Sequence, residues 1–295
     1  MLDRESTFKN PEVVKLLKEN FIPIAIDQAY QRRQKDNEGS FYQKIANQGP
    51  RKVGKGTTQG LYIADASGKL LGFSNNRGAE RVINMMRKAM KEPRTTDFGK
   101  ITKGKSDLRY NPSPPKGGLV IRVTTKVLGG YEKTENTYRK IMHNSLGRDN
   151  FWVTGSEKKE LINGKLPDTF LRRLVRFHLV DNTRGEPTMW GPSDIRTIKG
   201  NLENGQLSAK VVLRNGQGDR GYEAQILGII KTEAGEITGF DAVAKGQYWG
   251  EGKYTRNAPE GRFPLAVAFK LADGKDIADS IPPQGSRGWV RGYIN

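Results

Sequence analysis

The chain has 295 residues, no cysteine and only two histidines, and its formal net charge is +18. Without a thiolate it lacks the nucleophile of thiol–disulfide exchange and the soft ligand of most structural zinc sites. Structural disulfides are excluded too, and two histidines are too few for a His-rich metal cage. We therefore predict neither a metal site nor a cofactor.

The positive charge is spread along the chain. Residues 1–100 hold 19 Lys/Arg against 11 Asp/Glu (+8), and the remainder holds 31 against 21 (+10). Such a field attracts polyanions such as nucleic acid, anionic lipid or acidic polysaccharide without selecting one. No recognition module accompanies the charge, so a solvated basic surface is the interpretation that composition favours. No run approaches the roughly 18 apolar residues of a membrane span.

Residues 1–92 show the pattern of an α/β domain. A helix from about Asn10 to Asn20 is favoured by Pro11 in its first turn and by a spaced apolar face. The other predicted elements are a buried strand over 21–27, a helix over 40–47, a hairpin of strands 60–64 and 70–73, and a helix over 79–91.

Residues 93–117 are rich in Lys, Gly and Pro and predict a linker. Residues 118–295 predict an α+β domain dominated by an antiparallel β-meander. Asn204-Gly205 marks a hairpin turn, and Thr154 with Glu157 fits a capping box ahead of a short helix. The predicted strands are 119–128, 207–213, 222–230, 237–245 and 263–271, and a helix opened by Pro167-Asp168 runs to His178.

The first thirty residues carry a closely spaced motif. It reads Asp3-Arg4-Glu5-Ser6-Thr7-Phe8, Asn10-Pro11-Glu12-Val13-Val14 and Glu19-Asn20-Phe21-Ile22-Pro23-Ile24-Ala25-Ile26-Asp27. This run resembles the bacterial thioredoxin-like family that includes the spermatogenesis-associated thioredoxin-like proteins. The resemblance implies a thioredoxin-like N-terminal domain over residues 1–92, and residues 117–295 resemble no family.

The chain departs from that family at its redox site. By the family's spacing both cysteines and the first strand would precede Met1, so the first strand is missing. The loop position of the family's cis-proline, which grips substrate backbone, holds Thr57, Thr58 and Gln59. The resemblance thus implies a degenerate, redox-inactive domain in which these three residues remain candidates for binding. By analogy with the family it also implies a location outside the cytoplasm.

Two polar stretches of the second domain are candidate sites. His178, Asp181, Arg184 and Glu186 could arrange a general base and an anion clamp. The alternative for His178 is a core histidine, or one that complements the end of its helix.

The second stretch contains Trp249, Tyr254 and Arg256, which could stack on sugars or bases. Packing of the loop on its own aromatic residues is the alternative. Arg172, Arg173 and Arg176 are expected on a solvated helix face, and the Gly-rich segment 215–221 is expected to be a hairpin loop, not a phosphate loop.

The sequence therefore favours a non-enzymatic binding or scaffolding protein, with a protein as its partner. One alternative is the C-terminal remainder of a thiol–disulfide oxidoreductase whose cysteines lie upstream of Met1. Another is a basic polyanion-binding protein.

Overall fold

The computed structural model describes residues 6–76, 78–96 and 104–294. It divides the chain into two compact units, Asp3–Pro112 and Ser113–Asn295. We call these the N-terminal and C-terminal units. Their boundary lies inside the predicted linker. Residues 97–103 of that linker, and Asp3, Arg4 and Glu5 of the family motif, lie outside the described residues.

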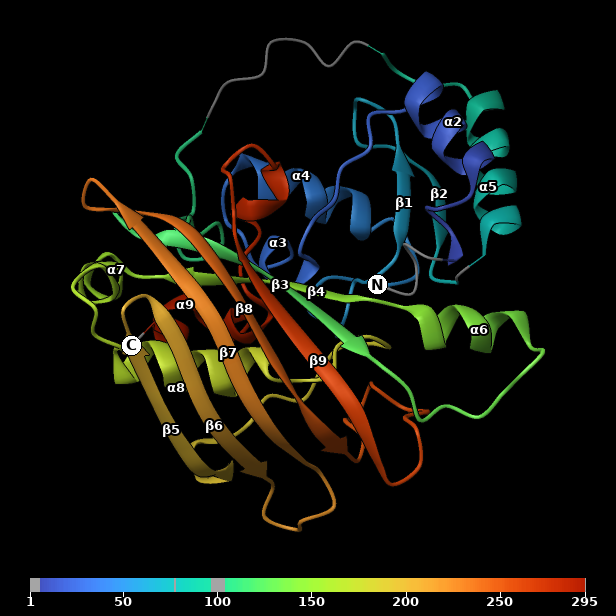
Figure 1. Cartoon of the computed structure of the whole chain (residues 1–295). Coiled ribbons are helices and arrows are strands. Elements are labelled where there is room, and N and C mark those ends of the chain that lie inside the picture. Colours follow the sequence, from blue (N-terminus) through green and yellow to red (C-terminus); the bar gives the residue numbers. More distant parts are fainter. Residues whose placement is uncertain (1–5, 77, 97–103, 295) are drawn as a thin grey trace. The chain divides into compact units, whose positions relative to one another are not determined.

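The N-terminal unit combines helices with one short β-hairpin (Figure 1). Its elements are α2 (Pro11–Asn20), α3 (Gln28–Gln31), α4 (Asn37–Ala46), β1 (Leu61–Ala64), β2 (Leu70–Ser74) and α5 (Ala79–Lys91). Strands β1 and β2 are antiparallel and form a two-stranded sheet, as the predicted hairpin requires. The helices predicted over 10–20, 40–47 and 79–91 are all present.

Helix α2 begins where its sequence predicts. The Asn10 side chain accepts hydrogen bonds from the backbone N–H groups of Glu12 (2.9 Å) and Val13 (3.2 Å), and Pro11 opens the first turn. The helix packs against α5 through a small apolar core formed by Val13, Val82, Ile83 and Met86. Burial of these side chains holds the two helices together.

The turn between β1 and β2 is organised by one carboxylate. Asp65 accepts hydrogen bonds from the Ser67 hydroxyl (2.7 Å) and from the backbone N–H groups of Thr95 (3.0 Å), Lys69 (3.0 Å) and Ser67 (2.9 Å). These bonds, that from the Ser67 hydroxyl first, lower the pKa of Asp65 to about 2. The ionised carboxylate therefore joins the hairpin to the chain that follows α5.

The predicted buried strand over 21–27 is wrong. The segment is extended, but among the described residues no backbone hydrogen bond involves residues 22–26, and β1 pairs only with β2. Ile22 is 88% exposed and Ile24 is 77% exposed. The described chain supplies no neighbouring strand to pair with this segment, and Pro23 has no N–H to donate.

The C-terminal unit is built on a seven-stranded antiparallel sheet with the order β4-β3-β9-β8-β7-β6-β5. The strands are β3 (Leu119–Val127), β4 (Gly147–Val153), β5 (Ile195–Glu203), β6 (Gln206–Arg214), β7 (Gly221–Glu233), β8 (Glu236–Trp249) and β9 (Arg262–Leu271). The α-helices are α6 (Thr137–Asn144), α7 (Gly155–Ile162), α8 (Asp168–His178) and α9 (Val290–Ile294), with short 3-10 helices at Pro192–Asp194, Ile277–Ser280 and Gln284–Ser286.

One face of this sheet is buried against α8 (Figure 1). Strand β6 shows why: Leu207, Ala209, Val211 and Leu213 are all buried, and they alternate with the less buried residues Ser208, Lys210 and Val212. We call this the inner sheet face and the opposite one the outer sheet face. The predicted meander is present, and the turn at Asn204-Gly205 has the two positive φ angles (50° and 75°) of a tight hairpin.

We predict that Asp65→Asn destabilises the N-terminal unit in a pH-dependent way. The folded-state pKa is depressed, so the contribution of the carboxylate is complete above pH 4 and is lost as pH falls towards 2. Urea unfolding of the wild type and the variant should give a difference at pH 6 that shrinks by pH 2. A difference that stays constant over this range would contradict the assignment.

We also predict that Ile24→Ser changes the free energy of unfolding by less than about 0.5 kcal/mol, because the side chain is exposed. Met86→Ala serves as the comparison and should cost about 2–5 kcal/mol, because Met86 is 1% exposed. Both are measured by chemical denaturation. A large loss for Ile24→Ser would show that this segment is buried in solution.

Candidate functional site

The predicted polar cluster of the C-terminal unit is dispersed in the structure. His178 ends α8 and is completely buried. Its Nε2 lies 2.7 Å from the Tyr293 hydroxyl, and its Nδ1 lies 3.1 Å from a carboxylate oxygen of Asp149. The histidine therefore joins α8, β4 and α9 inside the core, which is the structural alternative given above.

Asp181 and Arg184 form a separate buried ion pair. Arg184 also donates to the Tyr131 hydroxyl (2.6 Å) and to the Arg256 carbonyl (3.2 Å). Burial disfavours the charged guanidinium, but the Asp181 carboxylate and the Tyr131 hydroxyl together outweigh this effect and raise the pKa of Arg184. Glu186 lies at the surface and pairs with Arg287 at 2.5 Å. The four predicted residues thus have three different sets of partners.

Arg173 corrects the expectation of a solvated arginine face on α8. Its guanidinium is buried, pairs with Glu157 and donates to the Trp152 carbonyl at 2.8 Å. Glu157 is the capping-box acid of α7, so one carboxylate serves both the helix start and the buried cation. Arg172 is exposed, as predicted, and Arg176 is half-buried.

The Thr57–Gln59 loop is held in place by hydrogen bonds between Thr58 and other segments of the N-terminal unit. Thr58 is buried, and its hydroxyl lies 2.7 Å from the Tyr42 hydroxyl and 3.1 Å from the Gln28 side-chain oxygen. Thr57 and Gln59 are exposed. No cis peptide bond occurs among the described residues, so the loop has the backbone geometry of ordinary trans peptides there.

The aromatic stretch also has structural partners. The Arg262 guanidinium stacks on Trp249 at 4.1 Å from the ring centroid, and the Trp249 indole donates to the Gly218 carbonyl at 3.1 Å. Tyr254 and Arg256 are exposed in the following loop. The Trp249 side chain is therefore held by contacts within the protein, whereas the side chains of Tyr254 and Arg256 are accessible to solvent.

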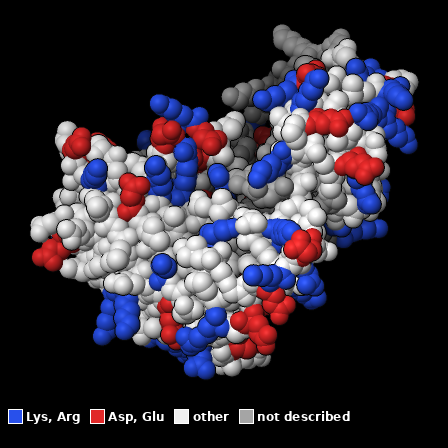
Figure 2. Space-filling view, turned by 45° about the vertical axis from the view of Figure 1, so that its right-hand side comes forward, with Lys and Arg blue, Asp and Glu red and all other residues white. Residues whose placement is uncertain are grey.

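The surface charge is mixed at large scale. In the space-filling view Lys and Arg lie among Asp and Glu over the visible face (Figure 2). The sequence alone does not reveal a finer pattern of charge, because the residues that become neighbours across a sheet depend on strand register. On the outer sheet face, lysines from different strands are aligned.

A row of lysines crosses that face. In register across β5, β6, β7, β8, β9 and β3 stand Lys199, Lys210, Gln225, Lys245, Ala266 and Lys126. We call Lys199, Lys210 and Lys245 the lysine row. All three are exposed, and in the described part of the chain none has a side-chain hydrogen bond or an ion pair. Lys126 differs, since it donates to the His143 carbonyl at 3.2 Å.

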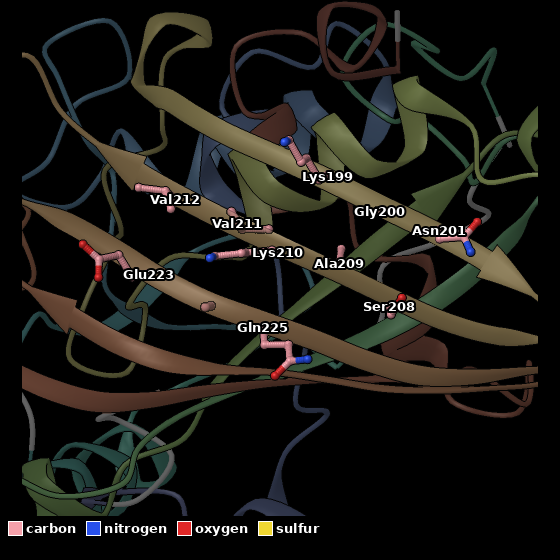
Figure 3. Close-up of a pocket in the computed structure, with 11 residues that line it drawn as sticks. Lys199, Gly200, Asn201, Ser208, Ala209, Lys210, Val211, Val212, Glu223 and Gln225 are labelled. Atoms are coloured by element: carbon pink, nitrogen blue, oxygen red, sulfur yellow. The ribbon is translucent and has the colours of Figure 1, made fainter.

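The lysine row borders an open groove of about 850 Å³ across β5, β6 and β7. The polar residues that line it are Lys199, Asn201, Ser208, Lys210, Glu223 and Gln225, whose side chains stand on the strands in Figure 3. The groove is shallow and unenclosed, unlike the concave pockets that bury most of a small ligand. Its shape suits part of a larger molecule.

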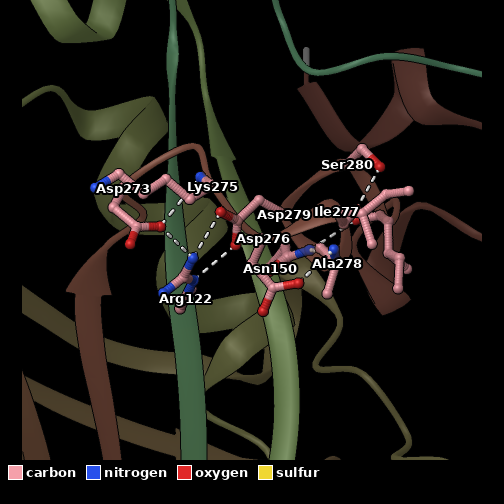
Figure 4. A network of polar contacts seen from close by, with 10 residues as sticks. Arg122, Asn150, Asp273, Lys275, Asp276, Ile277, Ala278, Asp279 and Ser280 are labelled. Atoms are coloured by element: carbon pink, nitrogen blue, oxygen red, sulfur yellow. Dashed lines mark hydrogen bonds and ion pairs between the residues drawn. The ribbon is translucent and has the colours of Figure 1, made fainter.

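Arg122 lies on the same sheet face, but its charge is neutralised by two acidic residues. It pairs with Asp279 (2.7 Å) and Asp273 (2.6 Å), both from the segment after β9 (Figure 4). Asn150, beside Arg122 on β4, donates to the carbonyls of Ala278 and Ile281. The chain after β9 therefore covers this end of the outer face, whereas the lysine row stays uncovered.

The described residues contain no group of three or more His, Asp or Glu side chains that could hold a metal ion. No helix in the described ranges is long and apolar enough to cross a membrane.

We predict that Asp181→Ala destabilises the C-terminal unit by about 3–5 kcal/mol, because it leaves the buried Arg184 charge unpaired. Glu186→Ala removes an exposed ion pair and should cost about 0–1 kcal/mol. Chemical denaturation measures both. Equal effects of the two substitutions would contradict the buried, structural role of Asp181.

Comparison with known proteins gives no relative for this chain: no protein-family model, no curated protein and no solved structure matches it.

Proposed function

We propose that this chain is a non-enzymatic binding protein whose outer sheet face binds an anionic partner. The observation that carries the proposal is the lysine row, in which three exposed lysines stand in one line that contains no acidic residue. Glu223, the acid near Lys210 on this face, pairs with Arg262 at 2.9 Å. Three arginines of the C-terminal unit, by contrast, have acidic partners. Arg173 and Arg184 are paired in the core, and Arg122 is paired at the surface.

The register places Lys199 directly opposite Lys210 on the same face. Like charges in this position destabilise a sheet, because neighbouring strands are only about 4.8 Å apart. In water two such charges repel by roughly 1 kcal/mol. An anion bound between them would turn this repulsion into attraction, so the arrangement favours ligand binding over stability.

The buried clusters support binding over catalysis. A general base must reach its substrate within hydrogen-bond distance. His178 and Asp181 are both inside the core, and each already has a protein partner. The shallow groove likewise favours a macromolecular partner over a small substrate.

For the N-terminal unit, a thioredoxin-like domain without redox residues remains our proposal. It is supported by the order of α2, α4, the β1–β2 hairpin and α5, which agrees with the order expected from the family resemblance, whereas the strand expected over 21–27 is absent among the described elements. Lacking cysteine, this unit would contribute binding and not thiol exchange.

We predict that Lys199→Gln combined with Lys210→Gln weakens the binding of labelled poly-L-glutamate by about tenfold or more in 50 mM salt. The substitutions remove two charges and keep a polar side chain that is one atom shorter. Because charge drives the interaction, wild-type affinity should fall steeply as salt rises, and the variant should show a shallower dependence. Fluorescence anisotropy across a salt series measures both quantities.

The matched control is Lys159→Gln with Lys165→Gln. These lysines are also exposed, but they lie on and after α7, and Leu166, next to Lys165, packs against Gly200 on the inner sheet face. The control has the same net charge as the test variant, so it should bind almost as the wild type does. Equal weakening by both pairs would mean that only net charge matters, and the proposed site would be wrong.

A further inference from the structure

The lysine row has an apolar neighbour on the outer sheet face. Leu227 and Val243 stand opposite each other on β7 and β8, and Ile229 is two residues along from Leu227. Their exposed fractions are 55%, 44% and 54%. We call these three residues the apolar patch. On β8 the residue opposite Ile229 is the exposed Asp241, so the apolar character is strongest at Leu227 and Val243. A sheet face turned to water is normally polar, so exposed aliphatic residues in its middle indicate a binding partner.

The apolar patch and the lysine row run side by side. On β7 and β8, Gln225 faces Lys245, and two residues further along Leu227 faces Val243. Two residues of a strand span about 6.7 Å, so the row and the patch are one side-chain spacing apart. A ligand lying across the strands would meet cations along one edge and apolar groups along the other.

Helix geometry matches this surface. An α-helix is about 10–12 Å wide, enough to cover both the row and the patch, and its 5.4 Å pitch is close to the spacing of about 4.8 Å between strands. Acidic residues placed once per turn would therefore meet successive strands. Leucines at i, i+3 and i+4 beside them would rest on Leu227 and Val243.

From this juxtaposition we propose that the outer sheet face binds an acidic amphipathic polypeptide helix, laid across β5 to β8 with its acidic stripe on the lysine row and its apolar stripe on the apolar patch. The inference rests on the proposed function and adds the class of ligand. Nucleic acid and acidic polysaccharide could satisfy the lysines, but neither has aliphatic groups to cover the patch.

The test compares two probes on three proteins. One probe is a synthetic 18-residue peptide with glutamate and leucine stripes on adjacent helix faces, and the other is oligodeoxythymidylate of similar charge. The proteins are the wild type, Leu227→Ser with Val243→Ser, and Lys199→Gln with Lys210→Gln. Thermal unfolding checks that each variant folds, which is expected because all four side chains are exposed.

We expect the Leu227/Val243 variant to weaken peptide binding about tenfold or more, with its salt dependence unchanged and oligodeoxythymidylate binding unaffected. The Lys199/Lys210 variant should weaken both probes. A scrambled peptide of the same composition should bind more weakly than the striped one. The peptide should also gain helical circular dichroism on binding.

Two failures are distinguishable. If both probes respond to the lysines and neither responds to Leu227 and Val243, the anionic site stands and the amphipathic helix is wrong. If neither probe responds to Lys199 and Lys210, the proposed function and this inference both fall. A variant pair that does not fold is replaced by Ile229→Ser alone, which should give a smaller loss limited to the peptide.

Discussion

The alternation of side chains along the seven antiparallel strands is the constraint on which the C-terminal unit depends. It sends one set of residues to α8 and the core and the other set to water, and the register then decides which outward residues become neighbours. The core, the lysine row and the apolar patch all follow from this pairing. A slip of one residue would exchange the buried and exposed sets.

The buried arginines and the lysine row of this unit differ physically. Arginines inside the core, such as Arg173 and Arg184, are paired with carboxylates, because an unpaired buried charge would cost several kcal/mol. Lysines on the outer face need no partner for stability, since water solvates them. Their alignment in a line that contains no acidic residue is therefore not required for folding, and it is the feature that points to a ligand.

Local patterns predicted most of the elements, and long-range pairing explains the rest. The hairpin at Asn204-Gly205, the capping box at Thr154 and the helix over 79–91 follow from nearby residues and are present. The apolar segment 21–27 has the composition of a strand, but its state depends on a neighbour that no local pattern reveals. Arg173 was likewise expected on an exposed helix face, because the sequence does not show that Glu157 lies beside it in the fold. The lysine row could not be predicted, because its members are distant in sequence and meet only through the register.

Lysine footprinting tests the central claim most directly. The protein is acetylated with and without the striped acidic peptide, and the modification of each lysine is measured by mass spectrometry. Binding at the outer sheet face predicts that Lys199, Lys210 and Lys245 become protected while Lys159 and Lys165 react as before. Equal protection of both groups, or protection of Lys159 and Lys165 alone, would contradict it.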